Sequence, residues 1–176
     1  MTHDEFCKKV KDFDILSEYK SARSNIKCRC HNCNSVITVK ARNLIEGSGC
    51  PVCKESKGEQ RLRRYFNDNN IDFESQKTFD NLVGVGGKLL RFDFYLPEYK
   101  VLIEYQGEFH NNNIPNNFQS KSKYLRQVEH DNRKKIFAQN NGFGFIEIWY
   151  WDYENIENIL DKYLRKEDEL CQKMIM

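Results

Sequence analysis

Two Cys-x-x-Cys motifs constrain the fold of this chain more than any other feature. They span Cys30–Cys33 and Cys50–Cys53, with 16 residues between them. Each motif can present two thiolates to one tetrahedral ion, and we expect an intervening hairpin to bring the pairs together. The sequence therefore predicts a zinc ribbon with four cysteine ligands. Four thiolates close the coordination sphere, so this zinc would stabilise structure and leave no open position for catalysis.

Two further donors lie beside the first motif and leave its ligand set open. Cys28 precedes Cys30 by two residues, so a β-strand would place both side chains on one face. We favour Cys30 as the ligand because its spacing to Cys33 repeats the spacing of the second motif, and Cys28 is the alternative. His31 is a spare donor. Unrelated core cysteines are the competing interpretation of the whole cluster.

Length and charge suggest two domains. The 176 residues suffice for one ordinary domain, or for a domain fused to a small dependent module. Residues 1–57 carry 11 Lys or Arg against 7 Asp or Glu, whereas residues 58–176 carry 17 against 19. We expect an N-terminal segment with the zinc ribbon over 1–57, too small to fold without zinc, and a globular domain over 58–176.

Two absences from the sequence bear on its compartment. No apolar run approaches the roughly 20 residues of a membrane helix, and the N-terminus lacks the basic and apolar regions of a signal peptide. We therefore expect a cytoplasmic protein without a membrane partner, in which disulfides are disfavoured. The sequence carries no signal for an oligomeric state.

Hydrophobic periodicity in the second part predicts an α/β sandwich around a mixed sheet. Helical spacing covers 58–69, 121–140 and 153–170, and β-rich segments cover 73–79, 88–96, 100–106 and 143–150. We expect the segments 88–96 and 100–106 to form a hairpin at the centre of the sheet. The glycine-rich run 84–88 lies between strands, which favours a glycine hairpin over a phosphate loop.

Acidic and polar side chains interrupt the two central strands. Asp93 lies in an apolar strand, Glu104 follows Val101-Leu102-Ile103, and Gln106 shares the face of Glu104. A carboxylate in such a setting is costly unless it binds a cation or a partner. Hard oxygen ligands suit Mg²⁺, so Asp93 and Glu104 are candidate magnesium ligands. Edge positions that face solvent are the alternative.

These residues resemble the motif of PD-(D/E)XK nucleases. Asp93, a ten-residue gap and then Glu104-Tyr105-Gln106 follow its pattern, with glutamine where lysine is usual. The strings 92–97 and 103–110 are similar to the branch related to very-short-patch repair endonucleases, which includes phage-borne homing endonucleases with an EDxHD signature. In that branch an N-terminal zinc ribbon often precedes the nuclease. The resemblance covers residues 26–150 and implies a restriction-endonuclease-like mixed sheet flanked by helices.

The resemblance also implies site residues, position by position. The first-helix glutamate of the family falls on Glu59, and its catalytic strand aspartate falls on Asp93. The histidine after the Gln-Gly turn falls on His110. The aspartate of the later helix falls on Asp131, followed by Lys134 in an Asp-x-x-Lys pattern.

Two positions depart from the family pattern, and four have ordinary alternatives. Gln106 replaces a lysine or histidine that can act on a proton, and Glu104 holds a position that is not acidic in every member. Glu59 would also be explained by a helix start that the dipole favours. His110 would also be explained as an ordinary loop histidine. Asp131 and Lys134 would also be explained as a surface ion pair on one helix.

The implied reaction is Mg²⁺-dependent hydrolysis of a DNA phosphodiester. Mg²⁺ bound by Asp93, with Glu104 or a backbone carbonyl nearby, would lower the pKa of its water and neutralise the growing charge. His110 would take or relay a proton, and Lys134 would stabilise the phosphate. We thus expect a metal-dependent endodeoxyribonuclease of homing, mobile-element or repair type, with DNA as partner and zinc and magnesium as cofactors.

Two other functional classes remain open. A zinc-ribbon DNA-binding protein with a degenerate, non-cutting nuclease fold would explain Gln106. A structural or partner-binding protein would explain only the acidic second part. The asparagine-rich loop 111–117 is either a DNA-backbone contact or an ordinary solvated loop. The basic residues that give the ribbon a plausible phosphate-binding surface are Lys20, Arg23, Lys27, Arg29, Lys40 and Arg42.

Overall fold

The computed structural model of the chain describes residues 1–107 and 118–164. The chain divides into two compact units, Met1–Ser56 and Lys57–Met176, and the boundary expected after residue 57 lies one residue away. Within the described residues, no helix is both long and apolar enough to cross a membrane. His110 and the loop 111–117 lie outside the described residues, as does the end of the helix expected over 153–170.

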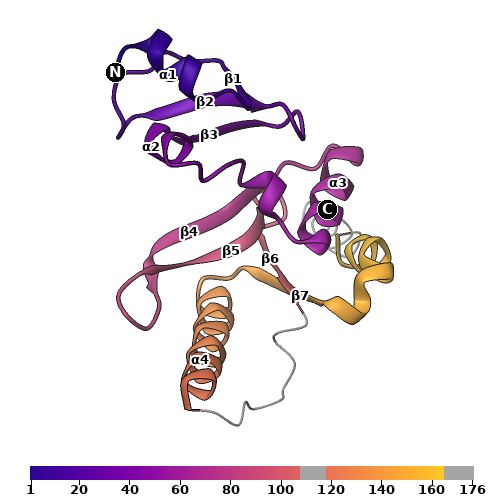
Figure 1. Cartoon of the computed structure of the whole chain (residues 1–176). Coiled ribbons are helices and arrows are strands. Elements are labelled where there is room, and N and C mark those ends of the chain that lie inside the picture. The colour runs from indigo at the N-terminus through magenta and orange to yellow at the C-terminus, as the bar shows by residue number, and fades with distance from the viewer. Residues whose placement is uncertain (108–117, 165–176) are drawn as a thin grey trace. The chain divides into compact units, whose positions relative to one another are not determined.

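The first unit contains a three-stranded antiparallel sheet (Figure 1). Its first helix begins at a capping box, in which the Thr2 hydroxyl accepts the Glu5 N–H and the Glu5 carboxylate accepts the Thr2 N–H. Phe6, Ile26 and other buried side chains form its small core. The elements are α1 (His3–Lys9), β1 (Phe13–Ile15), β2 (Asn25–Cys30), β3 (Val36–Lys40), α2 (Ala41–Ile45) and η1 (Val52–Lys54).

The prediction of a hairpin between the two cysteine motifs is wrong. β2 and β3 instead form a hairpin around the first motif, and α2 occupies part of the chain that leads to the second motif. Only Ala41 and Leu44 of α2 are buried. Two buried positions in five residues give too short a pattern for helical periodicity to be recognised.

The second unit contains a four-stranded mixed sheet in the order β4-β5-β6-β7. β5 pairs antiparallel with β4 and β6, and β6 runs parallel to β7 (Figure 1). The expected α/β class, with β5 and β6 at the centre of a mixed sheet, is confirmed. A helix over 156–164 ends the described chain. The other elements are α3 (Lys57–Asp68), β4 (Glu74–Val83), β5 (Leu89–Leu96), β6 (Val101–Gln106), α4 (Phe118–Asn140), β7 (Gly144–Trp149) and η3 (Tyr150–Asn155).

Two hydrophobic cores form on the faces of this sheet. Phe94 packs in one core with Leu62 of α3 and with the helix over 156–164. Phe92 packs in the other core with Phe137 of α4. Residues two apart on a regular strand share one face, yet Phe92 and Phe94 belong to different cores. Asp93 therefore lies between two residues of β5 that belong to different cores.

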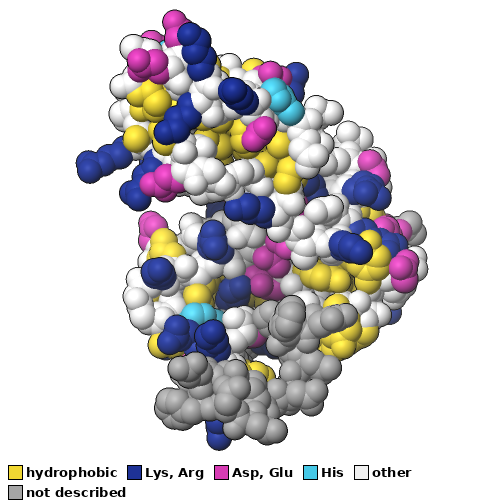
Figure 2. All heavy atoms as spheres, in the orientation of Figure 1, with side chains coloured by type: hydrophobic (Ala, Val, Ile, Leu, Met, Phe, Trp, Pro, Cys, Tyr) yellow, Lys and Arg dark blue, Asp and Glu magenta, His cyan; other side chains and the backbone are white. Residues whose placement is uncertain are grey.

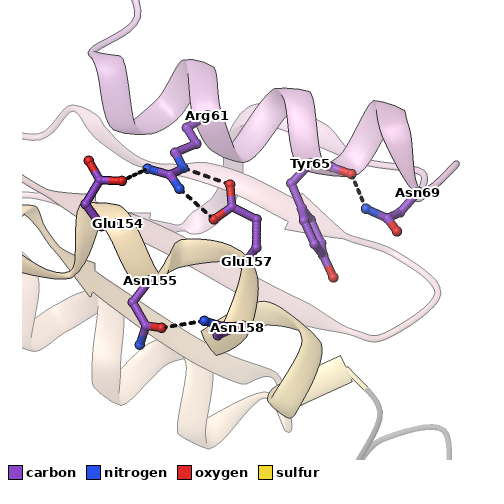
Figure 3. A network of polar contacts seen from close by, with 7 residues as sticks. All are labelled: Arg61, Tyr65, Asn69, Glu154, Asn155, Glu157 and Asn158. Carbon is purple, nitrogen blue, oxygen red and sulfur yellow. Dashed lines mark hydrogen bonds and ion pairs between the residues drawn. The ribbon is translucent and has the colours of Figure 1, made fainter.

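Ion pairs join α3 to the segment after β7 (Figure 3). The Arg61 guanidinium makes a bidentate pair with Glu157, at 2.7 and 2.9 Å, and a third contact of 3.0 Å with Glu154. The Tyr65 hydroxyl donates to Asp161 at 2.6 Å. Bidentate arginine–carboxylate pairs fix geometry as well as adding energy. These contacts hold the orientation of α3 against the C-terminal helical segment.

Candidate functional site

The four motif cysteines lie together. Their sulfurs are all within 4.8 Å of one another, and the pairs Cys30–Cys53 and Cys33–Cys50 are 3.7 Å apart. Tetrahedral zinc, with Zn–S bonds of about 2.3 Å, requires sulfurs about 3.8 Å apart. The donor set therefore fits a zinc ion in both chemistry and spacing.

The environment of the sulfurs supports a cation at this point. Burial raises the pKa of the Cys50 thiol to about 12, so a thiolate there needs a compensating positive charge. The Asn32 amide donates to Cys53 Sγ at 3.3 Å and orients that sulfur. The cluster is thus arranged to hold four thiolates around one metal.

The two spare donors lie outside the cluster. Cys28 is fully buried in the core of the first unit, and burial raises its pKa to about 11. The imidazole of His31 contacts Asp14 at 2.9 Å. Cys30, rather than Cys28, completes the four-sulfur set.

The strand aspartate lies where the two central strands separate. Pairing between β5 and β6 covers Phe94–Leu96 and Val101–Ile103. Beyond it, Asp93 Oδ2 accepts the backbone N–H of Tyr105 at 2.8 Å. The Asp93 side chain thus accepts a backbone N–H that a backbone carbonyl would accept in a regular sheet. This contact fixes one carboxylate oxygen of Asp93.

Glu104 forms a buried ion pair with α4. Lys134 Nζ lies 2.8 Å from Glu104 Oε1, and the two residues are 9% and 6% exposed. The Asp131 carboxylate, one turn before Lys134, accepts from Gln127 at 2.8 Å. Its charge also acts on Glu104. Asp131 and Lys134 therefore both face the carboxylate of β6, and Lys134 is not the surface residue that its helix spacing also allowed.

The carboxylates of this site are difficult to ionise together. Burial raises the pKa of Glu104 to about 8, and the charge of Asp93 adds to the rise while Lys134 opposes it. Burial raises the pKa of Asp93 to about 6, and the charge of Glu59 adds to that rise. Two carboxylates with raised pKa values at one point favour a cation between or beside them.

The first turn of α3 brings Glu59 to the site. A Cβ atom at Gly58 would overlap the ring of Tyr105, so only glycine permits the helix to lie this close to β6. Glu59 is the next residue, and its charge is felt by Asp93. The helix thus delivers its first-turn carboxylate to the end of the central strands.

One residue of the site has no signal in the sequence pattern. Gln76 of β4 places its amide Nε2 3.5 Å from both Glu59 Oε1 and Asp93 Oδ1. Its backbone has a φ of 54°, in the left-handed region. Glutamine has no preference for that region, so sequence reasoning offers no reason to single it out.

Gln106 lies on the same buried side of β6 as Glu104, but its amide is engaged elsewhere. It is 3% exposed, and its Nε2 lies 3.4 Å from Glu147 of the parallel strand β7. Glu147 in turn pairs with Lys135 at 2.8 Å. Gln106 thus ties the two parallel strands together beside the carboxylates. Of the predicted catalytic set, the structure brings together Glu59, Asp93, Glu104, Asp131 and Lys134, with Gln106 adjacent.

The ribbon presents part of its basic set to solvent. Lys27 and Arg29 occupy alternate exposed positions of β2 and so share its outer face. Lys40 donates to the backbone carbonyl of Arg23 at 3.2 Å. Arg42 pairs with Glu46 at 2.7 Å. Lys27 and Arg29 therefore form a basic pair on one exposed strand face.

No family model matches the chain, and no curated protein matches it significantly. Within the described residues, the cysteine cluster is the only group of three or more Cys, His, Asp or Glu whose ligand atoms converge closely enough for a metal. A second ion would therefore need further ligands beyond the carboxylates described.

Proposed function

We propose that this chain is a Mg²⁺-dependent DNA endonuclease with a restriction-endonuclease-like fold. One observation carries the proposal: residues far apart in the chain, from α3, β5, β6 and α4, meet at one end of a mixed sheet. The residues are Glu59, Asp93, Glu104, Asp131 and Lys134. They are also the described residues that the resemblance to the very-short-patch-repair branch of PD-(D/E)XK nucleases implies.

The chemistry of Asp93 and Glu104 fits a magnesium ion. Mg²⁺ is usually held by one or two carboxylates together with waters and substrate phosphate oxygens. Glu104 is buried and Asp93 is partly buried, and such a site would take its remaining ligands from water or phosphate, because no third carboxylate among the described residues converges with them as closely as the cysteine sulfurs do. A bound ion would supply a water of lowered pKa and neutralise charge on the phosphate.

The residues of the chain have distinct roles in the proposal. Asp93 is anchored through the Tyr105 N–H and offers its other oxygen to the ion. Lys134 balances the charge of Glu104 before substrate binds and faces the phosphate when the pair rearranges. Gln106 cannot move a proton, so proton transfer passes to His110 or to a metal-bound water.

The first unit is proposed to bind the DNA backbone. A zinc ion in the four-cysteine cluster holds the ribbon folded, and Lys27 and Arg29 on the outer face of β2 contact phosphates.

On the face of the 57–176 unit seen in Figure 2, acidic side chains gather in a patch with Lys and Arg beside it. That pattern suits an ion and a phosphate in one place.

Plasmid cleavage tests the proposal. The zinc-loaded protein with Mg²⁺ should nick or cut DNA, and Asp93→Asn should lower the rate at least about 100-fold, since several kcal/mol of charge stabilisation are lost. Asp80→Asn, at an exposed position of β4, is the matched control and should keep the wild-type rate. Wild-type cleavage by Asp93→Asn would overturn the assignment.

The Lys134–Glu104 ion pair and Gln106 favour one alternative, a zinc-ribbon DNA-binding protein that does not cut. An internal ammonium already neutralises Glu104 in that case. It predicts DNA binding that weakens steeply with salt, and no cleavage with any divalent ion. Sequencing the ends of any products would separate nicking from double-strand cleavage.

A further inference from the structure

We propose that Gln76 is a positioning residue of the carboxylate site, held in a strained backbone conformation so that its amide lies between Glu59 and Asp93. The inference deepens the proposed function and rests on it. It concerns a residue that neither the sequence pattern nor the family resemblance assigns.

The amide is placed to serve both carboxylates. Gln76 Nε2 lies 3.5 Å from Glu59 Oε1 and 3.5 Å from Asp93 Oδ1. A primary amide nitrogen carries two N–H groups, so it can direct one to each oxygen. The carboxylates come from different elements, α3 and β5, and they repel each other. The amide offsets that repulsion and keeps both groups directed at one point.

The backbone at Gln76 adopts a conformation that residues other than glycine rarely adopt. Four described residues other than glycine have positive φ: Asn34, Asn70, Gln76 and Lys100. Asparagine tolerates this region through its short polar side chain, and Lys100 lies in the turn before β6. Gln76 alone of these four lies within a strand, and its side chain is exposed. Its neighbours Ser75 and Lys77 still pair with β5.

Such strain persists where the surrounding structure maintains it, and it concentrates at functional sites. The contacts to Glu59 and Asp93 are the features that distinguish Gln76 from the other three residues. The positive φ of Gln76 changes the direction of its side chain from that of a regular strand residue, so that its amide lies beside the carboxylates of Glu59 and Asp93. The conformation thus serves the site rather than the sheet.

A matched pair of glycine variants tests the inference. Gln76→Gly and Lys100→Gly both relieve a positive φ and both remove a long exposed side chain. Neither should lower the urea midpoint of the second unit, Lys57–Met176, which we call the sheet unit, because glycine adopts this region freely. Only Gln76→Gly should raise the Mg²⁺ concentration needed for half-maximal cleavage, by about 10–100-fold, as is typical when a residue that orients metal ligands is removed. Equal Mg²⁺ requirements in the two variants would overturn the inference while leaving the nuclease intact.

A second measurement needs neither metal nor cleavage. Without added divalent ion, Glu59→Gln relieves the repulsion of Asp93 and should stabilise the unit more in the Gln76→Gly background than in the wild type. We expect a coupling of at least about threefold in the folding equilibrium constant, within the range for contacting residues. The cycle with Lys100→Gly should be additive.

The two measurements separate the inference from the function on which it rests. Coupling between positions 59 and 76 in a protein that never cuts DNA would sustain the role of Gln76 and reject the nuclease. Additive changes would reject the role of Gln76 whatever the activity of the protein.

Discussion

The stability of the sheet unit should fall as pH rises from 5 to 8, and Glu104 should account for most of the fall. Its pKa is raised from 4.5 to about 8 by burial first and by Asp93 second, against the opposing effect of Lys134. The folded state therefore holds a proton that the unfolded state has released, so its contribution is complete below pH 4.5 and is lost as pH rises through 8. One pKa unit corresponds to about 1.4 kcal/mol, so the loss between pH 5 and 8 is at most about 3–4 kcal/mol.

Tryptophan fluorescence isolates this effect. The chain has two tryptophans, Trp149 and Trp151, and both lie in the sheet unit, so urea unfolding followed by their emission does not report the ribbon. Glu104→Gln removes the titration but adds a fixed offset, because a neutral amide replaces the carboxyl group beside Lys134. The free-energy difference between wild type and Glu104→Gln should therefore change with pH, to the disadvantage of the wild type at pH 8. A difference that stays constant from pH 5 to 8 would show that Glu104 is ionised throughout and refute the reasoning. Glu98→Gln, at an exposed turn, should give a flat difference.

Three further predictions concern other parts of the molecule. Cys33→Ser should abolish binding of one zinc per chain, measured by metal release to a chromogenic chelator, whereas Cys28→Ser should retain it; equal loss in both would reject the ligand set. Gly58→Ala should lower the urea-unfolding free energy of the sheet unit by about 1–3 kcal/mol through overlap with the ring of Tyr105, whereas the control Gly107→Ala meets no atom within 4 Å and should not. An unchanged unfolding free energy in Gly58→Ala would contradict the close packing of α3. His130 accepts a backbone N–H at 2.9 Å, and burial, followed by the charges of neighbouring arginines, lowers its pKa. The wild type should therefore lose stability relative to His130→Ala as pH falls from 7 to 5, and parallel stability profiles of the two proteins over this pH range would refute the prediction.

The features that the sequence predicted are those encoded over short spans. Apolar periodicity indicated α3, β5, β6 and β7 because each buries a repeated set of side chains. Equal spacing of the two Cys-x-x-Cys motifs favoured Cys30 over Cys28 because coordination geometry is local to each motif. The carboxylate positions came from family resemblance, and their roles stay predictions.

The features that escaped the sequence depend on contacts between distant residues. Lys134 was a candidate site residue with a surface ion pair to Asp131 as the alternative, but the sequence carries no signal for its buried contact with Glu104, 30 residues away in the chain. Gln76 has an ordinary polar identity, and only the tertiary structure gives its backbone a left-handed conformation. Helix α2 buries too few residues to leave a periodic pattern.

The position of Asp93 between Phe92 and Phe94 makes the alignment of the site a shared property of two cores. Phe94 is set by the packing of α3, and Phe92 is set by the packing of α4. The carboxylate between them therefore takes its position from both. A cavity in either core would displace Asp93 without touching any charged residue, so substitutions such as Leu62→Ala or Phe137→Leu can tune the site from a distance. In a protein built this way, natural variation of buried apolar residues is a route to an altered site geometry, with the polar residues of the site themselves unchanged.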